Sequence, residues 1–149
     1  MREARLDDME SVKLLDKQTV WEQMEEEERN TIKDFDKYHD ELWEKMMKDP
    51  EMALYVAEAS DGRVVGMVWL GVRERISGAK FGWIYDVTVD REFRKRGLGT
   101  LLMQRAEEHL RAMGVLGIGL MALTGNEGAR RLHRKVGFRD YSTYMIKKL

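Results

Sequence analysis

The sequence predicts a mixed α/β fold in which a mostly antiparallel sheet is combined with helices. Two runs typical of strands, 52–59 and 64–72, flank a turn-forming segment and together predict a β-hairpin. A third run, 81–89, is rich in β-branched and aromatic residues and leads through a turn into a helix of apolar periodicity. Because a further strand is expected after that helix, the strands on its two sides should be parallel neighbours.

The first part of the chain is expected to contain a strand and a helix. Residues 2–6 are typical of a short edge strand. Asp7 or Asp8 is placed to cap a helix that runs to about Gln18. The apolar side of this helix is formed by Val12, Leu14 and Leu15.

A second helix is expected between Ile32 and Pro50. Apolar residues recur there at three- and four-residue spacing and form one stripe, while the other side is acidic. Pro50 prevents the helix from continuing. The region has more aromatic residues than a bare surface helix needs, so some should line an acceptor site or a dimer contact: Trp21, Phe35, Tyr38, His39 and Trp43.

The second half of the chain continues the alternation of strands and helices. A loop at 73–80 precedes the central strand, and the helix that follows this strand stops at Gly114. A strand at 116–123 comes next, then a short helix closed by Gly137, and finally a strand at 140–149.

Composition limits the class of protein. The length of 149 residues is typical of one domain, and no repeat or linker divides the chain, so residues 1–149 are expected to form a single domain. The absence of cysteine excludes disulfides and thiolate chemistry. No apolar run is long enough to span a membrane and charges begin at Arg2, so a cytoplasmic protein with no membrane partner is expected.

Charge is divided unevenly along the chain. Residues 1–60 hold 9 Lys or Arg and 18 Asp or Glu, whereas residues 61–149 hold 17 and 9. A basic half can indicate nucleic acid binding. Because its positive residues flank a turn with two glycines, a small polyanion explains them without a nucleic acid partner.

This turn, RKRGLG at 94–99, is the most informative stretch of the sequence. Glycine lets a ligand approach the backbone, and the free amides at a helix N-terminus attract anions, so the turn predicts a phosphate cradle. A nucleoside-triphosphate loop is excluded, because only one residue separates the two glycines. A dinucleotide fingerprint is excluded because its third glycine would stand where this chain has Leu102.

The turn resembles the pyrophosphate-binding signature Q/R-x-x-G-x-G/A of the GCN5-related N-acetyltransferase (GNAT) family. A second stretch, 126–138, resembles the N-x-x-A-x-x-L-Y-x-x-x-G-F segment of the same family and matches it at Asn126, Ala129, Leu132, Gly137 and Phe138. The resemblance covers 50–149, the expected acetyl-CoA-binding core. For 1–49, the expected variable acceptor-side helices, it is only topological.

The resemblance implies a sheet with helices on both faces and acetyl-CoA as cosubstrate, held between the strands at 84–89 and 117–123, with no metal. The implied activity is acetyl transfer to a primary amine of a small molecule or peptide by direct attack in a ternary complex. The backbone of Val87, Thr88 and Val89 would pair with the pantetheine. The pyrophosphate would be held by Arg94, Lys95, Arg96, Gly97, Leu98, Gly99 and Thr100, and Asn126 is included in the cofactor-binding set.

The main departure from the family pattern is His133. It stands where the family has a Tyr that donates a proton to the departing thiolate. A histidine could replace that acid if its surroundings raised its pKa, or it could form a hydrogen bond with the sulfur. Alternatively, His133 only packs on the face of its helix.

The general base is expected to be Asp86, acting through water. Relatives that acetylate polyamines and other small amines often have Glu-Asp where this chain has Tyr85-Asp86, so Tyr85 replaces a carboxylate. Strand alternation would place the two side chains on opposite faces. Tyr85 would then share a face with Phe81 and Trp83, either as core packing or as an aromatic wall for a cation or an apolar group.

Three functions remain open from the sequence. The first is an N-acetyltransferase with His133, Asp86 and Tyr85 as its catalytic set. Its acidic second helix either attracts a basic acceptor, such as a polyamine, an aminoglycoside or a lysine side chain, or is a solvated surface. The second is a catalytically silent acyl-CoA-binding regulatory module, which the changes at Tyr85 and His133 favour. The third is a small nucleic-acid-binding domain.

Overall fold

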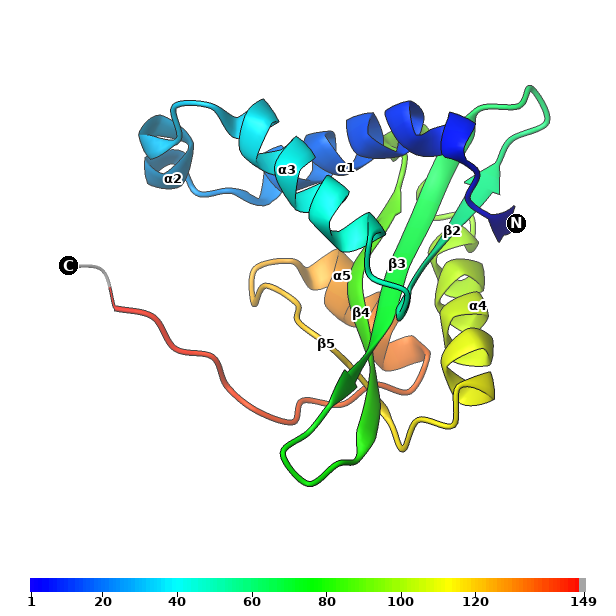
Figure 1. Ribbon diagram of the computed structural model, residues 1–149. Coiled ribbons are helices and arrows are strands. Elements are labelled where there is room, and N and C mark those ends of the chain that lie inside the picture. Colours follow the sequence, from blue (N-terminus) through cyan, green and yellow to red (C-terminus); the bar gives the residue numbers. More distant parts are fainter. Residues whose placement is uncertain (148–149) are drawn as a thin grey trace.

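One sheet forms the centre of the computed structural model, which describes residues 1–147 (Figure 1). Neighbouring strands are antiparallel from the first to the fourth, whereas the fifth is parallel to the fourth. The predicted mixed sheet and its parallel neighbours are therefore confirmed. The strands lie side by side in chain order: β1 (Arg2–Glu3), β2 (Met52–Glu58), β3 (Val64–Glu74), β4 (Lys80–Val89) and β5 (Ile118–Leu120).

Helices cover both faces of this sheet (Figure 1). They are α1 (Met9–Gln23), α2 (Glu26–Thr31), α3 (Phe35–Met47), α4 (Leu98–Ala112) and α5 (Glu127–Lys135). α1 and α3 lie over one face, where Val12, Trp43 and Trp69 are buried together. α4 and α5 lie against the other face, whose core includes Leu102 and Leu110. Apolar burial on both faces holds the central strands in place.

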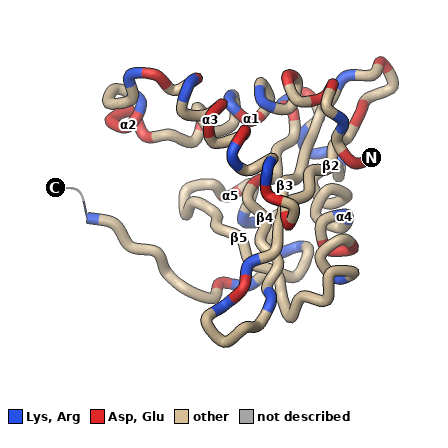
Figure 2. Tube along the Cα trace, viewed as in Figure 1, with Lys and Arg blue, Asp and Glu red and all other residues tan. Residues whose placement is uncertain are grey.

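The acidic first part of the chain is divided differently from the prediction. α1 continues beyond its predicted end to Gln23, and the short helix α2 follows as a separate element. α3 begins at Phe35 rather than Ile32, because Asp34 caps it and accepts a hydrogen bond from the Lys37 amide at 3.2 Å. The glutamates of α2 are exposed and form an acidic segment at the edge of the molecule (Figure 2).

The aromatic residues of this part do not all share one environment. Trp43 and His39 are buried between α3 and the sheet, while Tyr38 is 66% exposed. Trp21 packs on Phe35 with ring centroids 5.4 Å apart. Trp43 and His39 are therefore interior residues, and the others stay candidates for an acceptor site or a dimer contact.

The last predicted strand, 140–149, is wrong for the residues that the structure describes. Residues 139–147 run away from the sheet in extended form (Figure 1), and four apolar side chains in this segment are between 69% and 85% exposed: Tyr141, Tyr144, Met145 and Ile146. An alternating sequence becomes a strand only where its amides and carbonyls reach the edge of a sheet. No such pairing occurs for 139–147, and residues 148–149 lie outside the described part.

A β-bulge in β4 changes the direction of two predicted site residues. Trp69 of β3 pairs with Asp86, but the next residue, Leu70, pairs with Ile84, so Tyr85 is the extra residue. The Tyr85 and Trp69 rings lie 6.0 Å apart, and the Asp86 carboxyl meets a side chain of α1. Tyr85 and Asp86 therefore both lie on the face covered by α1 and α3. The prediction of opposite faces is wrong because the bulge interrupts the alternation.

Candidate active site

β4 and β5 separate partway along their length. They pair over Gly82–Ile84 and Ile118–Leu120, although β4 continues to Val89. β5 is therefore shorter than the predicted 116–123, because its only partner strand among the described residues stops pairing at Ile84. The edge of β4 that is left open contains the residues expected to pair with pantetheine: Val87, Thr88 and Val89.

The turn after β4 forms a concave array of backbone amides. Lys95 has a φ of 63° and Gly97 a φ of 84°, so the turn contains two left-handed residues. Gly97 is the N-cap of α4, and no side chain caps this helix. Within residues 1–147, the amides of Leu98, Gly99 and Thr100 donate to no backbone carbonyl. Amides arranged in this way are suited to an anion, and the phosphate cradle at this turn stays a prediction.

Two basic side chains of the turn are held by the protein itself. Arg94 Nε donates a hydrogen bond to the Val89 carbonyl at 2.8 Å, and the Arg94 guanidinium lies 3.6 Å from Glu22 of α1. The Arg96 guanidinium lies over the Phe93 ring, 5.5 Å from its centroid. The backbone amides are thus the groups best placed to contact a phosphate, while the arginines contribute positive potential.

The second sequence motif packs directly against this turn. A Cβ built on Gly99 would stand 2.9 Å from Leu132 Cδ2, so α5 touches the first turn of α4. Asn126 caps α5, and its Oδ1 accepts a hydrogen bond from the Ala129 amide at 3.0 Å. The side-chain oxygen of Asn126 is therefore occupied within α5. A contact of Asn126 with the cofactor stays a prediction.

His133 is buried on the inner side of α5. Its side chain lies beside Phe138, with ring centroids 6.1 Å apart, and the residue is 7% exposed. Neither ring nitrogen has a hydrogen-bond partner among residues 1–147. Burial lowers the pKa of His133, so the ring is neutral at neutral pH and carries a single N–H. The condition for an imidazolium acid, a raised pKa, is not met, and a hydrogen bond to a ligand atom is what the ring can offer.

Asp86 meets a second carboxyl in the protein interior. Asp86 Oδ2 accepts a hydrogen bond from Thr88 Oγ1 at 2.8 Å, and the carboxyl is within hydrogen-bonding reach of Asp16 on α1. Burial, followed by the charge of Asp16, raises the pKa of Asp86 to about 7. A carboxyl that titrates near neutral pH is suited to accept and release a proton.

Asp16, which contacts Asp86, was not expected in the site, and its partners His39 and Trp43 were expected only as candidates to line an acceptor site or a dimer contact. Asp16 Oδ2 lies 2.7 Å from both Trp43 Nε1 and His39 Nε2. One signal for Asp16 is visible in the sequence. It follows Val12 by four residues, so it places a carboxyl on the apolar side of α1.

The aromatic wall expected on β4 is covered by arginines. The Arg73 guanidinium carbon lies 4.5 Å from the Trp83 ring centroid and 4.8 Å from that of Tyr85, and Arg73 Nε donates to the Tyr85 hydroxyl at 3.1 Å. Arg75 covers Phe81 in the same way at 3.9 Å. The position that a cationic acceptor would take over these rings is therefore held by cations of the protein.

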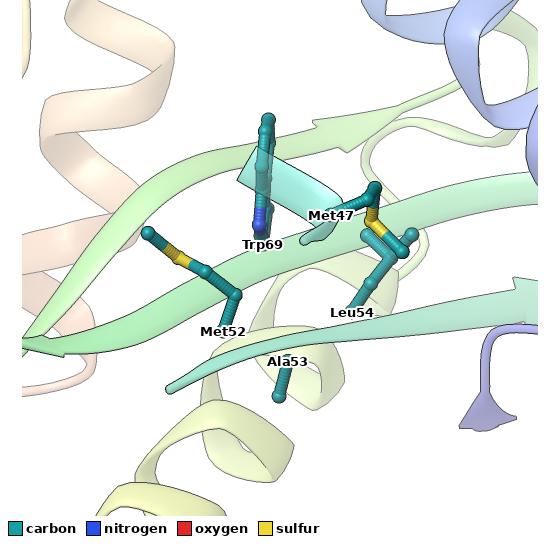
Figure 3. Close-up of a pocket in the computed structure, with 5 residues that line it drawn as sticks. All are labelled: Met47, Met52, Ala53, Leu54 and Trp69. Atoms are coloured by element: carbon teal, nitrogen blue, oxygen red, sulfur yellow. The ribbon is translucent and has the colours of Figure 1, made fainter. Parts of the chain in front are cut away.

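A small cavity lies beside Trp69, on the face covered by α3 (Figure 3). Its volume of about 30 Å³ is enough for about one water molecule. The cavity is too small for an amine acceptor, so it is not the acceptor site. Its lining comes from the end of α3 and from β2 and β3, through Met47, Met52, Ala53, Leu54 and Trp69.

Neither a metal-binding group nor a membrane-spanning helix occurs in residues 1–147. No group of three or more His, Asp or Glu side chains in this range is arranged to hold a metal ion. No helix in the same range is long and apolar enough to cross a bilayer.

Residues 18–138 match the acetyltransferase (GNAT) family, and the chain therefore belongs to this family. It is 30% identical over 112 residues to a mycothiol acetyltransferase of Thermobifida fusca, a match that covers 72% of this chain and 33% of that protein. It is also 30% identical over 118 residues to an uncharacterised N-acetyltransferase of Methanocaldococcus jannaschii, covering 71% of this chain and 50% of that one. The chain thus spans half or less of the length of these two relatives.

Solved structures with the same fold include several acetyltransferases. A putative acetyl transferase from Pyrococcus furiosus superimposes with a TM-score of 0.84 at 23% identity, over 97% of this chain and 95% of that one. AAC(6')-Iy in complex with the bisubstrate analogue CoA-S-monomethyl-acetylneamine gives 0.77 at 18% identity, over 99% and 95%. These likenesses confirm the predicted GNAT fold.

Proposed function

We propose that this protein is an N-acetyltransferase that moves the acetyl group of acetyl-CoA to a primary amine of a small molecule or peptide in a ternary complex. One observation carries the proposal: the open edge of β4 beyond Ile84 leads straight into the array of unpaired amides at Leu98–Thr100. An extended pantetheine can pair with such an edge while its pyrophosphate meets the amides. Membership of the GNAT family supports this proposal.

The residues at the turn and on α5 fit a CoA ligand. A Cβ built on Gly97 would have no atom within 4 Å, so the backbone there is open to a ligand. The ring nitrogens of His133 are buried and without a partner among the described residues, and such groups are costly unless a ligand or water satisfies them. A thioester sulfur or a pantetheine amide would meet that need.

The chemistry assigns a separate task to each group. The amine must first lose a proton, which Asp86 accepts directly or through a water. The neutral amine then attacks the thioester carbonyl, so that a C–N bond forms and the C–S bond breaks. An amide of β4 in the open edge stabilises the developing oxyanion. The proton lost by the nitrogen during amide formation ends on the sulfur, which the N–H of His133 stabilises as it departs.

Tyr85 is proposed to shape the acceptor side of the site. The bulge places Tyr85 on the same face as Asp86, and Arg73 binds its hydroxyl. The acceptor would enter beside this pair, between the acidic segment around α2 and the arginines of β3. The identity of this acceptor is the first question for experiment.

A thiol-release assay with acetyl-CoA tests the proposal. The acceptors would be polyamines, aminoglycosides, amino acids, lysine peptides and peptides with free N-termini, with calorimetric titration of CoA in parallel. Turnover on any class supports the proposal and identifies the acceptor. Absence of CoA binding would refute it.

The silent acyl-CoA-binding module remains the second candidate, because His133 is neutral and stands where the family has Tyr. CoA binding without turnover on any acceptor would favour this candidate. A homodimer is also proposed, because the segment 139–147 exposes apolar side chains that a second copy can cover. Light scattering on the purified protein should give the mass of two chains, and the mass of one chain would contradict the dimer.

A further inference from the structure

A cluster of five side chains lies beneath the acceptor side of β4. We call it the carboxyl cluster, and it consists of Asp16, His39, Trp43, Asp86 and Thr88. Asp16 is 6% exposed and His39 is 6% exposed, whereas Asp86 is only partly buried. Asp86 stands on β4, whose edge beyond Ile84 is open, and the Asp16 carboxyl on α1 contacts it.

The hydrogen bonds of the cluster determine where protons can sit. Trp43 Nε1 can only donate, so Asp16 Oδ2 accepts its hydrogen bond at 2.7 Å. His39 Nε2 lies 2.7 Å from the same oxygen, and a proton on Nε2 makes it the second donor. Thr88 Oγ1 donates to Asp86 Oδ2 at 2.8 Å. One oxygen of each carboxyl therefore accepts hydrogen bonds from these donors. The Asp16 and Asp86 carboxyls also contact each other, and two carboxylates have no proton to donate. A hydrogen bond between them requires that they share a proton.

The surroundings supply no cation to relieve the two carboxyls. Among residues 1–147, neither Asp16 nor Asp86 forms an ion pair with Lys or Arg. The charged groups nearest the cluster come from α1 and α3, where Lys17 contacts Asp36 at 3.1 Å and Asp40 at 3.2 Å, and Lys13 contacts Asp40 at 3.7 Å. Both lysines are therefore paired with carboxylates of α3 and not with the carboxyl cluster.

The protonation states agree with a shared proton. Burial raises the pKa of Asp16, and burial and then Asp16 raise that of Asp86. Burial and then Lys17 lower the pKa of His39, so His39 is neutral. With a neutral His39, the pair of carboxyls takes up one proton near neutral pH and then carries one negative charge.

We propose that Asp16 is a positioning residue for acetyl transfer, and that it shares one proton with Asp86 and thereby sets the protonation state in which Asp86 meets the acceptor. This inference rests on the proposed function for its catalytic consequence. Trp43 and His39 hold Asp16 in place through their donors. The single negative charge of the pair attracts an ammonium group, while two full charges would be too costly in this interior.

The proton transfer balances without any other reactant. The acceptor enters as an ammonium ion with one positive charge, and the carboxyl pair carries one negative charge. One N–H bond of the ammonium breaks and one O–H bond forms on Asp86. The products are a neutral amine and two neutral carboxyls, and the amine is then ready for attack on the thioester.

Titration of aspartate ¹³Cγ signals in the full-length protein tests the shared proton without any acceptor. The Asp86 signal is assigned by its loss in Asp86→Asn. In the unaltered protein it should titrate near neutral pH, and in Asp16→Asn its midpoint should fall by about one pH unit or more, because the neighbouring charge is gone. Glu10→Gln, the same chemical change at an exposed position of α1, should leave the midpoint in place.

Two results would overturn the proposal. One is an Asp86 midpoint in the ordinary carboxyl range in the unaltered protein. The other is an unchanged midpoint in Asp16→Asn, with an amide spectrum that shows the variant folded. In the kinetic test, the ionisation near neutral pH in the kcat/KM profile should move to lower pH in Asp16→Asn by the same amount as in the titration. If the titration shifts but no amine is acetylated by the unaltered protein, the proposed function fails and the shared proton stands.

Discussion

Gly99 and Leu132, one from each sequence motif, are in direct contact. A Cβ built on Gly99 would stand 2.9 Å from Leu132 Cδ2, closer than a real Cβ contact allows. The absence of a side chain at Gly99 therefore does two things. It leaves the backbone at the start of α4 without a side chain, and it lets α5, which contains His133, pack closely on that first turn.

Gly99→Ala tests this contact through stability. Alanine in a helix normally gains up to about 1 kcal/mol over glycine, but here the methyl group must displace Leu132. We expect little gain or a loss from Gly99→Ala alone, and a clear gain when it is made in a Leu132→Ala background. Gly128→Ala, in the first turn of α5, should be stabilising because its nearest atom is 3.7 Å away. Denaturant unfolding of the unaltered protein, the two single variants and the double variant measures the coupling between Gly99 and Leu132. Additive effects of the two substitutions on the free energy of unfolding would contradict the contact.

Gly97→Glu should abolish CoA binding. Its side chain would project from the amide array and add negative charge where the pyrophosphate is expected. Gly62→Glu is the matched control, because Gly62 has a φ of 86° against 84° for Gly97, and neither has an atom within 4 Å of an added Cβ. Both variants should lose about 1 kcal/mol of stability from the left-handed backbone. Calorimetry should show lost CoA affinity only for Gly97→Glu, and equal affinity of the two variants would refute the cradle.

His133→Ala should lower turnover more than acetyl-CoA affinity. The neutral ring offers one N–H, and a hydrogen bond to a developing thiolate contributes about 1.5 to 3 kcal/mol, so kcat should fall by about ten- to a hundredfold. His133→Tyr restores the residue type expected from the family pattern and should recover part of the activity. Unchanged kcat in His133→Ala would assign His133 to packing alone.

Stability at acidic pH should also depend on His133. Its pKa is lowered from 6.5 in the folded protein, so the unfolded chain takes up the proton first. The neutral ring contributes fully to stability above pH 6.5. Below pH 6.5 the free energy of unfolding falls, by at most about 1.4 kcal/mol per pH unit, until the pH reaches the folded-state pKa. We therefore expect His133→Phe to lose less stability than the unaltered protein between pH 7 and pH 5.5. Denaturant unfolding at the two pH values measures this loss. An equal loss of unfolding free energy in His133→Phe and in the unaltered protein would contradict a buried, neutral ring.

Arg73→Gln should change the choice of acceptor. The Arg73 guanidinium carbon lies 4.5 Å from the Trp83 ring centroid and 4.8 Å from that of Tyr85. It therefore covers one face of each ring and repels cations. Without it, the rings are open to an ammonium group, and KM for polyamines should fall severalfold. Arg111→Gln on α4, which pairs with Glu107 on an exposed surface, should have no such effect. A KM for polyamines that does not change in Arg73→Gln would exclude the rings from the acceptor site.

The long-range arrangement of the carboxyl cluster is beyond what local sequence patterns express. Asp86 was expected as a base from the family resemblance, but its partner Asp16 lies on another element 70 residues earlier in the chain. Only packing of α1 and α3 on the sheet brings Asp16, His39 and Asp86 together. The bulge at Tyr85 is likewise decided by pairing with β3, so alternation along β4 alone gave the wrong face.

Local sequence patterns were enough to predict the strands from β2 to β4, the helix start at the two glycines and the family. These features depend on periodicity, turn chemistry and short motifs. Tertiary structure alone decided the neutral state of His133, the cover of Arg73 over the aromatic rings and the proton balance of Asp86. Each of these depends on burial and on neighbours distant in the chain. The segment 139–147 shows the same limit, because its alternating pattern has no pairing edge among the described residues and therefore forms no strand.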